Sequence, residues 1–224
     1  MDKRIEVLGA WIDNYTFRES ILRAEKYLDN MVVNVIQMIS TKTLNQATES
    51  DEIKDYLNRI DLSVISETGI LPIIGADSKS RIKEIEEGYF TKTFLRRIRE
   101  SEKTGCVLAN DENQAEHFDA FLASENIPLT VTKPIIVDVT AENFAWDSVA
   151  NEINSNNIEI IISMMDISLN SEFLSEYQPQ LSIELFWGLG DDLQAIGADD
   201  GIIGGIKKVF FSKFLHRKVT KYSE

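Results

Sequence analysis

Short apolar runs alternate with amphipathic segments along most of this sequence, and that alternation predicts the secondary structure. Two runs, at residues 4–8 and 10–13, flank Gly9 and predict a small hairpin or bent strand. Thr16 and Glu19 have the spacing of a capping box, so we expect a helix to begin there. The continuous β-rich run at residues 31–39 predicts a strand that is buried on both faces.

The same alternation continues to the end of the chain. A polar helix is expected to follow through about residue 58, with a strand at 61–66, an apolar stretch broken by Pro72, and one or two helices over 78–102, divided around Gly88. Further strands are predicted at 105–109, 134–139, 158–163 and 181–187, and further helices at 111–125, 141–154, 169–177 and 202–215. This order predicts an α/β fold: a mostly parallel, doubly wound, Rossmann-like sheet with helices on both faces.

Composition and charge narrow the functional class. The chain has 224 residues and a net charge of −14, which argues against general binding of nucleic acid. The charge is uneven, because residues 201–224 hold six basic side chains and one acid, giving +5, whereas residues 1–200 carry −19. We therefore divide the chain into an α/β domain, 1–200, and a basic C-terminal segment, 201–224.

The sequence also bears on the cellular compartment. Cys106 is the only cysteine and lies in an apolar run, which is typical of a buried structural thiol in a reducing compartment. The N-terminus has no apolar signal-peptide core, and no stretch has the roughly 20 apolar residues of a membrane span. We expect a cytoplasmic protein that either stays in solution or lies peripherally on the inner face of the cell membrane.

Candidate chemistry is expected where the strands end, because ligands of open α/β sheets bind at the carboxyl edge. No dinucleotide or P-loop glycine motif is present, so no cofactor is predicted. The pairs Asp191-Asp192 and Asp199-Asp200 are better explained as solvated acids than as a cation site. His117 and His216 have no partners at zinc spacing, so no metal is predicted.

The C-terminal segment is the most distinctive local feature. Its apolar residues recur at intervals of three and four, and basic residues fall mostly between them, as in a basic amphipathic helix. Such a helix could lie in an anionic membrane interface or dock on the acidic body of the same chain, and the sequence leaves both open. The residues expected to contact a membrane are Lys207, Lys208, Phe210, Phe214 and Arg217.

Several segments together resemble the WecB/TagA/CpsF family of glycosyltransferases. They are the opening residues 4–16, the stretch 51–69 with its Tyr56-Leu57-Asn58-Arg59-Ile60-Asp61-Leu62 core, and then 105–118, 153–163 and 207–219, in matching order. The resemblance covers most of the chain as a pattern of elements. It implies transfer of a sugar from a nucleotide-diphosphate donor to a lipid-linked acceptor during assembly of cell-surface polysaccharide.

The chain departs from the family pattern at three places. Met38-Ile39-Ser40 stands where the family has Thr-x-Asn, Ser66 replaces the aspartate of an Asp-Gly pair, and residues 165–170 replace a Gly-Ser-Pro-Lys-Gln-Glu segment. Glu67, one position beyond the expected base, is the catalytic candidate. The substrate-binding candidates are Ser40, Ser66, Asn110 and Asp166.

Three hypotheses follow from these residues. The first is an active transferase that binds a nucleotide-sugar donor and a lipid-linked acceptor. The second is a catalytically degenerate paralogue that acts as a binding or scaffolding subunit, as a homo-oligomer or beside a homologous transferase. The third sets the resemblance aside and leaves an acidic α/β domain that binds a nucleotide or a protein. A cleft filled by Met164, Met165 and Trp187 would favour the second over the first.

Overall fold

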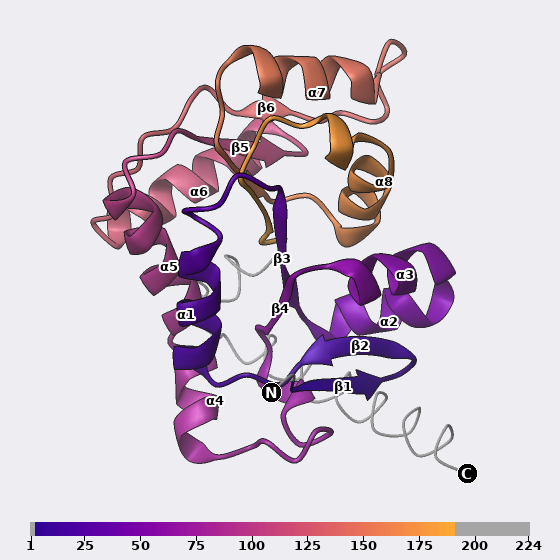
Figure 1. Cartoon of the computed structure of the whole chain (residues 1–224), viewed down its shortest axis with the longest axis vertical. Coiled ribbons are helices and arrows are strands. Elements are labelled where there is room, and N and C mark those ends of the chain that lie inside the picture. The colour runs from indigo at the N-terminus through magenta and orange to yellow at the C-terminus, as the bar shows by residue number, and fades with distance from the viewer. Residues whose placement is uncertain (1–2, 191–224) are drawn as a thin grey trace.

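The computed structural model describes residues 3–190 and is built around a six-stranded parallel sheet (Figure 1). The order of the strands is β4-β3-β8-β7-β5-β6, and all neighbouring pairs run parallel. The strands are β3 (Asn34–Ile39), β4 (Leu62–Ile65), β5 (Gly105–Ala109), β6 (Ile135–Ile136), β7 (Ile160–Ser163) and β8 (Leu185–Gly188). Nearly all of their residues are buried, since helices cover both faces.

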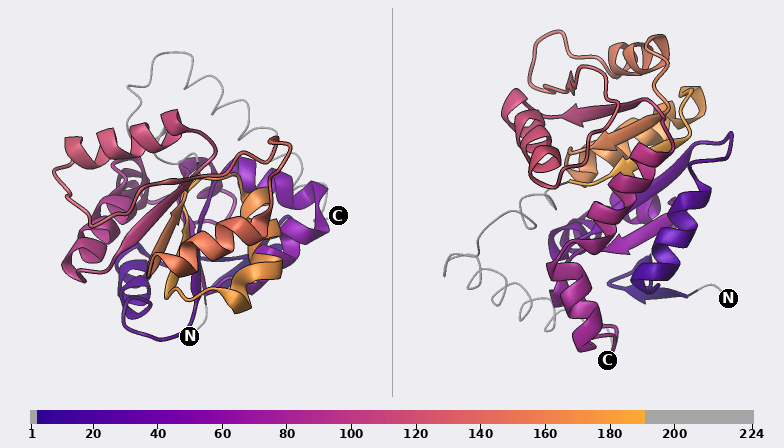
Figure 2. Two further views of the ribbon diagram at one scale, coloured as in Figure 1. Left: turned by 90° about the horizontal axis from the view of Figure 1, so that it is seen from above. Right: turned by 90° about the vertical axis from the view of Figure 1, so that its left-hand side faces the viewer.

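Helices on the two faces enclose two apolar clusters (Figure 2). One face carries α2 (Thr41–Glu49), α3 (Asp51–Arg59), α7 (Trp146–Ser155) and α8 (Ile167–Tyr177). The other carries α1 (Phe17–Lys26), α5 (Tyr89–Glu100) and α6 (Glu112–Ser124). Connections that run in opposite directions along the sheet use opposite faces, as right-handed crossovers require. The predicted doubly wound α/β fold is therefore confirmed.

A two-stranded antiparallel hairpin, β1 (Arg4–Val7) and β2 (Ala10–Asp13), lies beside the β4 edge of the sheet. Leu8 and Gly9 both have positive φ, which matches the twist of a two-residue hairpin turn. The Arg4 guanidinium donates to the carbonyl oxygens of Leu57 and Asn58, both at 3.1 Å, at the C-terminal end of α3. The hairpin is thus attached to the domain through the negative end of a helix dipole.

The predicted capping box is present at the start of α1. The Thr16 hydroxyl accepts from the backbone NH of Glu19, whose carboxylate in turn accepts from the Thr16 NH at 2.9 Å. The hydrogen bond from Lys3, followed by those from Thr16, lowers the pKa of Glu19 to about 2. The carboxylate therefore stays ionised at the positive end of the helix dipole at all ordinary pH values.

The structure corrects several predicted boundaries. β3 begins at Asn34 rather than residue 31, and Met31 is 98% exposed, because the Asn34 side chain donates to Asn30 and Val32 and holds 30–34 as a loop. Ser50 ends α2 and caps α3, so the polar segment is two helices. Gly88, at φ 62°, separates α4 (Lys79–Glu86) from α5. β6 has only two residues of the strand predicted at 134–139, α7 starts at Trp146 rather than 141, and β8 starts at Leu185 rather than 181. Residues 68–70 and 178–180 form 3₁₀ turns.

A buried amide ties the middle of the sheet together. The Gln37 side chain on β3 donates to the carbonyl oxygen of Gly188 on β8 at 3.0 Å and accepts from the Tyr56 hydroxyl of α3 at 3.0 Å. Asn170 of α8 donates to the same Gln37 oxygen at 3.4 Å and accepts from Ser163 of β7 at 2.6 Å. Gly188 is required here because a Cβ atom would collide with the Gln37 amide.

We expect Gly188→Ala to destabilise the protein by roughly 1–3 kcal/mol, the usual cost of overfilling a packed core. Gly105→Ala on β5 is the matched control, since its Cβ would meet Val131 at an ordinary 3.5 Å. That control should stay within about 1 kcal/mol of wild type. Urea unfolding of the three proteins measures both effects, and equal stability of the two variants would contradict the role given to Gln37.

Candidate functional site

Three of the candidate side chains lie around the N-terminal turn of α2. Ser40 caps this helix, with its hydroxyl accepting from the Thr43 NH at 3.2 Å. The Glu67 carboxylate, which follows β4, accepts from the Thr41 NH at 2.8 Å and from the Thr41 hydroxyl at 2.6 Å. Ser40 and Glu67 therefore satisfy backbone donors that a helix start leaves without partners. Their roles in the structure are those of helix caps.

Asp166, after β7, reaches the same helix from the other side. It caps α8 through the Ser168 NH at 3.1 Å, accepts from Gln46 at 2.7 Å, and forms an ion pair with Lys42 at 2.7 Å. Burial alone would raise the pKa of Asp166, but the hydrogen bonds from Lys42, Ser168 and Gln46 outweigh it and hold this pKa below its usual value. Asp166 is thus an ionised carboxylate that joins α2 to α8.

Asn110 stands apart from these three residues. It follows β5, which is separated from β3 by β8 and β7. Its backbone NH donates to the Gln114 side chain at 2.8 Å, and Gln114 in turn donates to the Met164 carbonyl at 2.9 Å. The Asn110 side-chain oxygen is buried without a hydrogen-bond partner among the described residues. The structure therefore gathers Ser40, Glu67 and Asp166, but not Asn110.

The large apolar residues after the strands fill the space between them. Met164 is 2% exposed and Met165 is fully buried, and the two pack into the clusters on opposite faces of the sheet. Trp187 is also fully buried, with its ring 5.2 Å from that of Phe94 on α5. All three side chains therefore belong to the apolar clusters that pack on the sheet.

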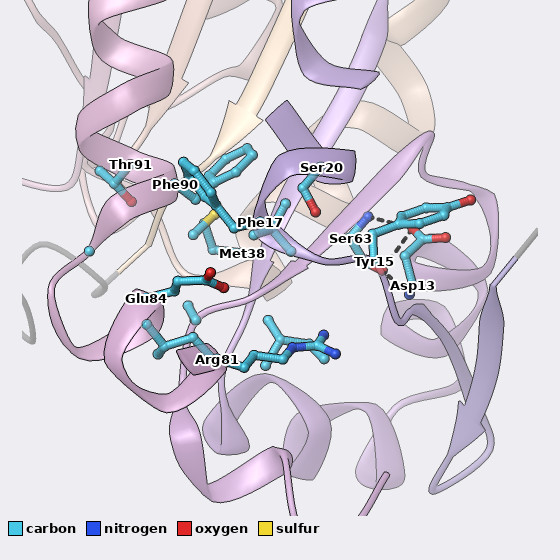
Figure 3. Close-up of a pocket in the computed structure, with 15 residues that line it drawn as sticks. Asp13, Tyr15, Phe17, Ser20, Met38, Ser63, Arg81, Glu84, Phe90 and Thr91 are labelled. Atoms are coloured by element: carbon cyan, nitrogen blue, oxygen red, sulfur yellow. Dashed lines mark hydrogen bonds between the residues drawn. The ribbon is translucent and has the colours of Figure 1, made fainter. Parts of the chain in front are cut away.

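A cavity of about 50 Å³ opens on the other side of β4, between α1, α4 and the start of α5 (Figure 3). Ser66 is the only candidate that lines it, and its hydroxyl donates to the Ile39 carbonyl at 3.0 Å. The remaining walls combine aromatic rings, hydroxyl groups and three charged side chains. They are formed by Asp13, Tyr15, Phe17, Ser20, Met38, Ser63, Val64, Ile65, Arg81, Glu84, Ile85, Gly88, Phe90 and Thr91.

The cavity brings together residues that sequence reasoning did not select. Asp13 is buried and accepts from the backbone NH of Ser63 at 2.8 Å, so it belongs to the joint between the hairpin and β4. Arg81 donates to the Asn14 side chain at 2.5 Å, across 67 positions of sequence. No local pattern links residues 13–20 with 81–91, since only the tertiary fold places these segments beside each other.

The other sequence candidates have limited roles in the described part of the chain. Cys106 is buried as predicted, and burial raises the pKa of its thiol, so it is an inert core residue. Among residues 3–190 no group of three or more metal-ligating side chains is found. The acidic pairs after residue 190, His216 and the five membrane candidates (Lys207, Lys208, Phe210, Phe214 and Arg217) lie outside the described residues, as does the 200/201 boundary.

Within residues 3–190 no helix is both long and apolar enough to cross a bilayer. Comparison of the sequence with family models and with curated proteins gives no match in either case. The resemblance to WecB/TagA/CpsF transferases thus remains a proposal, argued from the residues of this chain.

Asp166→Asn should lower the free energy of unfolding at pH 7 by about 1 kcal/mol, since it removes the ion pair with Lys42 and the negative charge at the N-terminus of α8. The folded-state pKa of Asp166 is depressed, so its contribution is present above the unfolded pKa and is lost as pH falls through the folded value. The difference between wild type and variant should therefore shrink between about pH 5 and pH 2. Denaturant unfolding across this range is the measurement, and a difference that does not depend on pH would contradict the assignment.

Proposed function

We propose that this chain is a glycosyltransferase-like protein of cell-surface polysaccharide assembly that does not transfer sugar and acts as a binding or scaffolding subunit. The proposal rests on the hydrogen bonds of Glu67, the candidate catalytic base. Its carboxylate accepts two hydrogen bonds from Thr41 and caps α2, outside the cavity beside β4. A general base needs a carboxylate that reaches the acceptor hydroxyl.

The residue that does face the cavity supports the same proposal. Ser66 stands at the position where the resemblance places the catalytic base. Its side chain is a hydroxyl that donates to the Ile39 carbonyl, so this position offers no carboxylate that could accept a proton. Asp166, which replaces part of the donor-binding segment, is engaged by Lys42 and Gln46. The three departures from the family pattern thus share one physical feature, since each position now stabilises the fold.

The proposal is tested by incubating the purified full chain with a nucleotide-diphosphate N-acetylhexosamine and a lipid-linked acceptor. No transfer is expected. Glu67→Gln should lower the melting temperature, because Thr41 loses an ionised hydrogen-bond acceptor, whereas Glu49→Gln at the exposed end of α2 should leave it unchanged. Transfer by wild type that is lost in Glu67→Gln but kept in Glu49→Gln would instead establish the active transferase.

The partners follow from the same proposal. A subunit that catalyses no reaction must act by binding other molecules. We therefore propose that it forms a homo-oligomer or binds a homologous transferase at the inner face of the cell membrane. The acidic body would be repelled by anionic lipid, which leaves the +5 segment, residues 201–224, to supply the contact. This assignment rests on the sequence of that segment alone.

Vesicles that contain phosphatidylglycerol should therefore sediment the full chain at low salt. Replacement of Lys207, Lys208 and Arg217 together by Gln should reduce binding by about tenfold or more, since each basic residue near such a surface contributes about 1 kcal/mol. A control that replaces Lys79, Lys83 and Arg99 by Gln removes the same charge from exposed positions of α4 and α5. Equal loss in both variants would contradict a specific role for the C-terminal segment.

A further inference from the structure

The cavity between α1, α4 and α5 has opposite charges at separate places. Figure 3 shows the guanidinium of Arg81 on the side of Asp13 and Tyr15, whereas the carboxylate of Glu84 lies on the side of Phe90 and Met38. A volume of about 50 Å³ exceeds the ~10–15 Å³ that one water needs, so a small polar group fits inside. The side chains that surround this space therefore determine which group it accepts.

Arg81 is the cation among the described residues that line this cavity. It donates to the neutral amide of Asn14 at 2.5 Å, and no carboxylate of the described residues lies within 4 Å of it. By contrast, Arg97 pairs with both Glu25 and Glu100 at 2.7 Å. Burial lowers the pKa of Arg81, against the opposing effects of Glu84 and Glu19. Glu84 and Glu19 act on this half-buried cation only from beyond contact distance, so the guanidinium can take an anion as a direct partner.

Of the two acids that line the cavity, Asp13 is already bound to other partners. Asp13 is nearly fully buried, and its carboxylate accepts from both the backbone NH and the hydroxyl of Ser63, at 2.8 and 3.0 Å. Its second oxygen faces Arg4 at 3.8 Å. The guanidinium of Arg81 keeps donors for the two oxygens of one carboxylate or phosphate, which it can bind in a bidentate manner.

The rest of the lining is largely aromatic, apolar and hydroxylic. Phe17 and Phe90 supply aromatic surface, and Met38 supplies a polarisable apolar one. Ser20 and Thr91 add hydroxyl groups, which can donate to or accept from a polar substituent. An anionic group carried on an apolar or ring-shaped body matches these walls better than a free inorganic ion does.

The helix that carries Arg81 is attached in a way that allows it to move. No residue of α4 is buried, and left-handed glycines stand on both sides of it, Gly75 at φ 64° and Gly88 at φ 62°. The bond from Arg81 to Asn14 joins α4 to the segment between the hairpin and α1. Ile82 and Ile85 of α4 are only partly buried against the core, so the bond from Arg81 to Asn14 is one of the contacts that hold this helix.

We propose that this cavity is a binding site for a small organic anion, a carboxylate or a phosphate monoester, that is held by Arg81 and covered by α4. The anion takes the guanidinium donors that no carboxylate of the described chain uses, and the aromatic walls contact its body. This inference does not depend on the resemblance to glycosyltransferases, so it stands or falls separately from the proposed function.

The test uses the full chain, labelled with ¹⁵N, and three probes: benzoate, phenyl phosphate and the neutral benzyl alcohol. At least one of the anions should bind with a dissociation constant below about 10 mM and shift the amides of Asn14 and of α4, and benzyl alcohol should bind about tenfold more weakly or not at all. Stronger binding of benzoate identifies a carboxylate ligand, and stronger binding of phenyl phosphate identifies a phosphate ester. No binding of either anion at 10 mM, or equal binding of the alcohol, would overturn the proposal.

Two variants of α4 separate a specific site from general attraction. Arg81→Gln should weaken anion binding by about tenfold or more, the usual effect of losing a charge-assisted hydrogen bond. Lys83→Gln removes the same charge from an exposed position of the same helix and should change binding by less than about twofold. Circular dichroism checks that both variants fold, and equal weakening in the two would refute a role specific to Arg81.

Discussion

The hydrogen bonds of one buried amide hold the centre of this fold. The Gln37 amide joins β3 to β8 by donating to the Gly188 carbonyl. Its side-chain oxygen accepts hydrogen bonds from Tyr56 of α3 and Asn170 of α8. A polar group at this depth is stable only when its bonding capacity is used, so three elements must meet it at fixed positions. This arrangement fixes how β3 and β8 lie against each other and against α3 and α8.

The polar residues at that edge follow the same rule. Helices that start directly after parallel strands expose backbone NH groups, and Ser40, Glu67 and Asp166 supply the acceptors that satisfy them. A side chain that satisfies a helix terminus is held in place and is less available for proton transfer. This competition explains why residues at the expected positions for catalysis form a connected structural set around α2 and α8 instead of an open site.

The space for a ligand arises elsewhere, where the packing is less complete. The hairpin is joined to β4 through Asp13 and Ser63, and α4 spans the gap with no buried residue of its own. The cavity lies between these two attachments, and it contains a half-buried cation whose described partner is neutral. The cavity thus lies where the packing depends on partly buried side chains, and this is the region that we propose as a ligand site.

The sequence alone determined the order and type of the elements, because short buried strands and capped helices carry local signals: Thr16 with Glu19, Gly88, and the apolar runs of β5 and β7. It also identified the strand ends as the place where polar residues gather. Only the tertiary structure decided that Met31 is exposed, that β7 and β8 separate the strand before Asn110 from the strand before Ser40, and that Arg81 meets Asn14. These outcomes depend on contacts between residues far apart in the chain, and a single sequence carries no local pattern for such contacts.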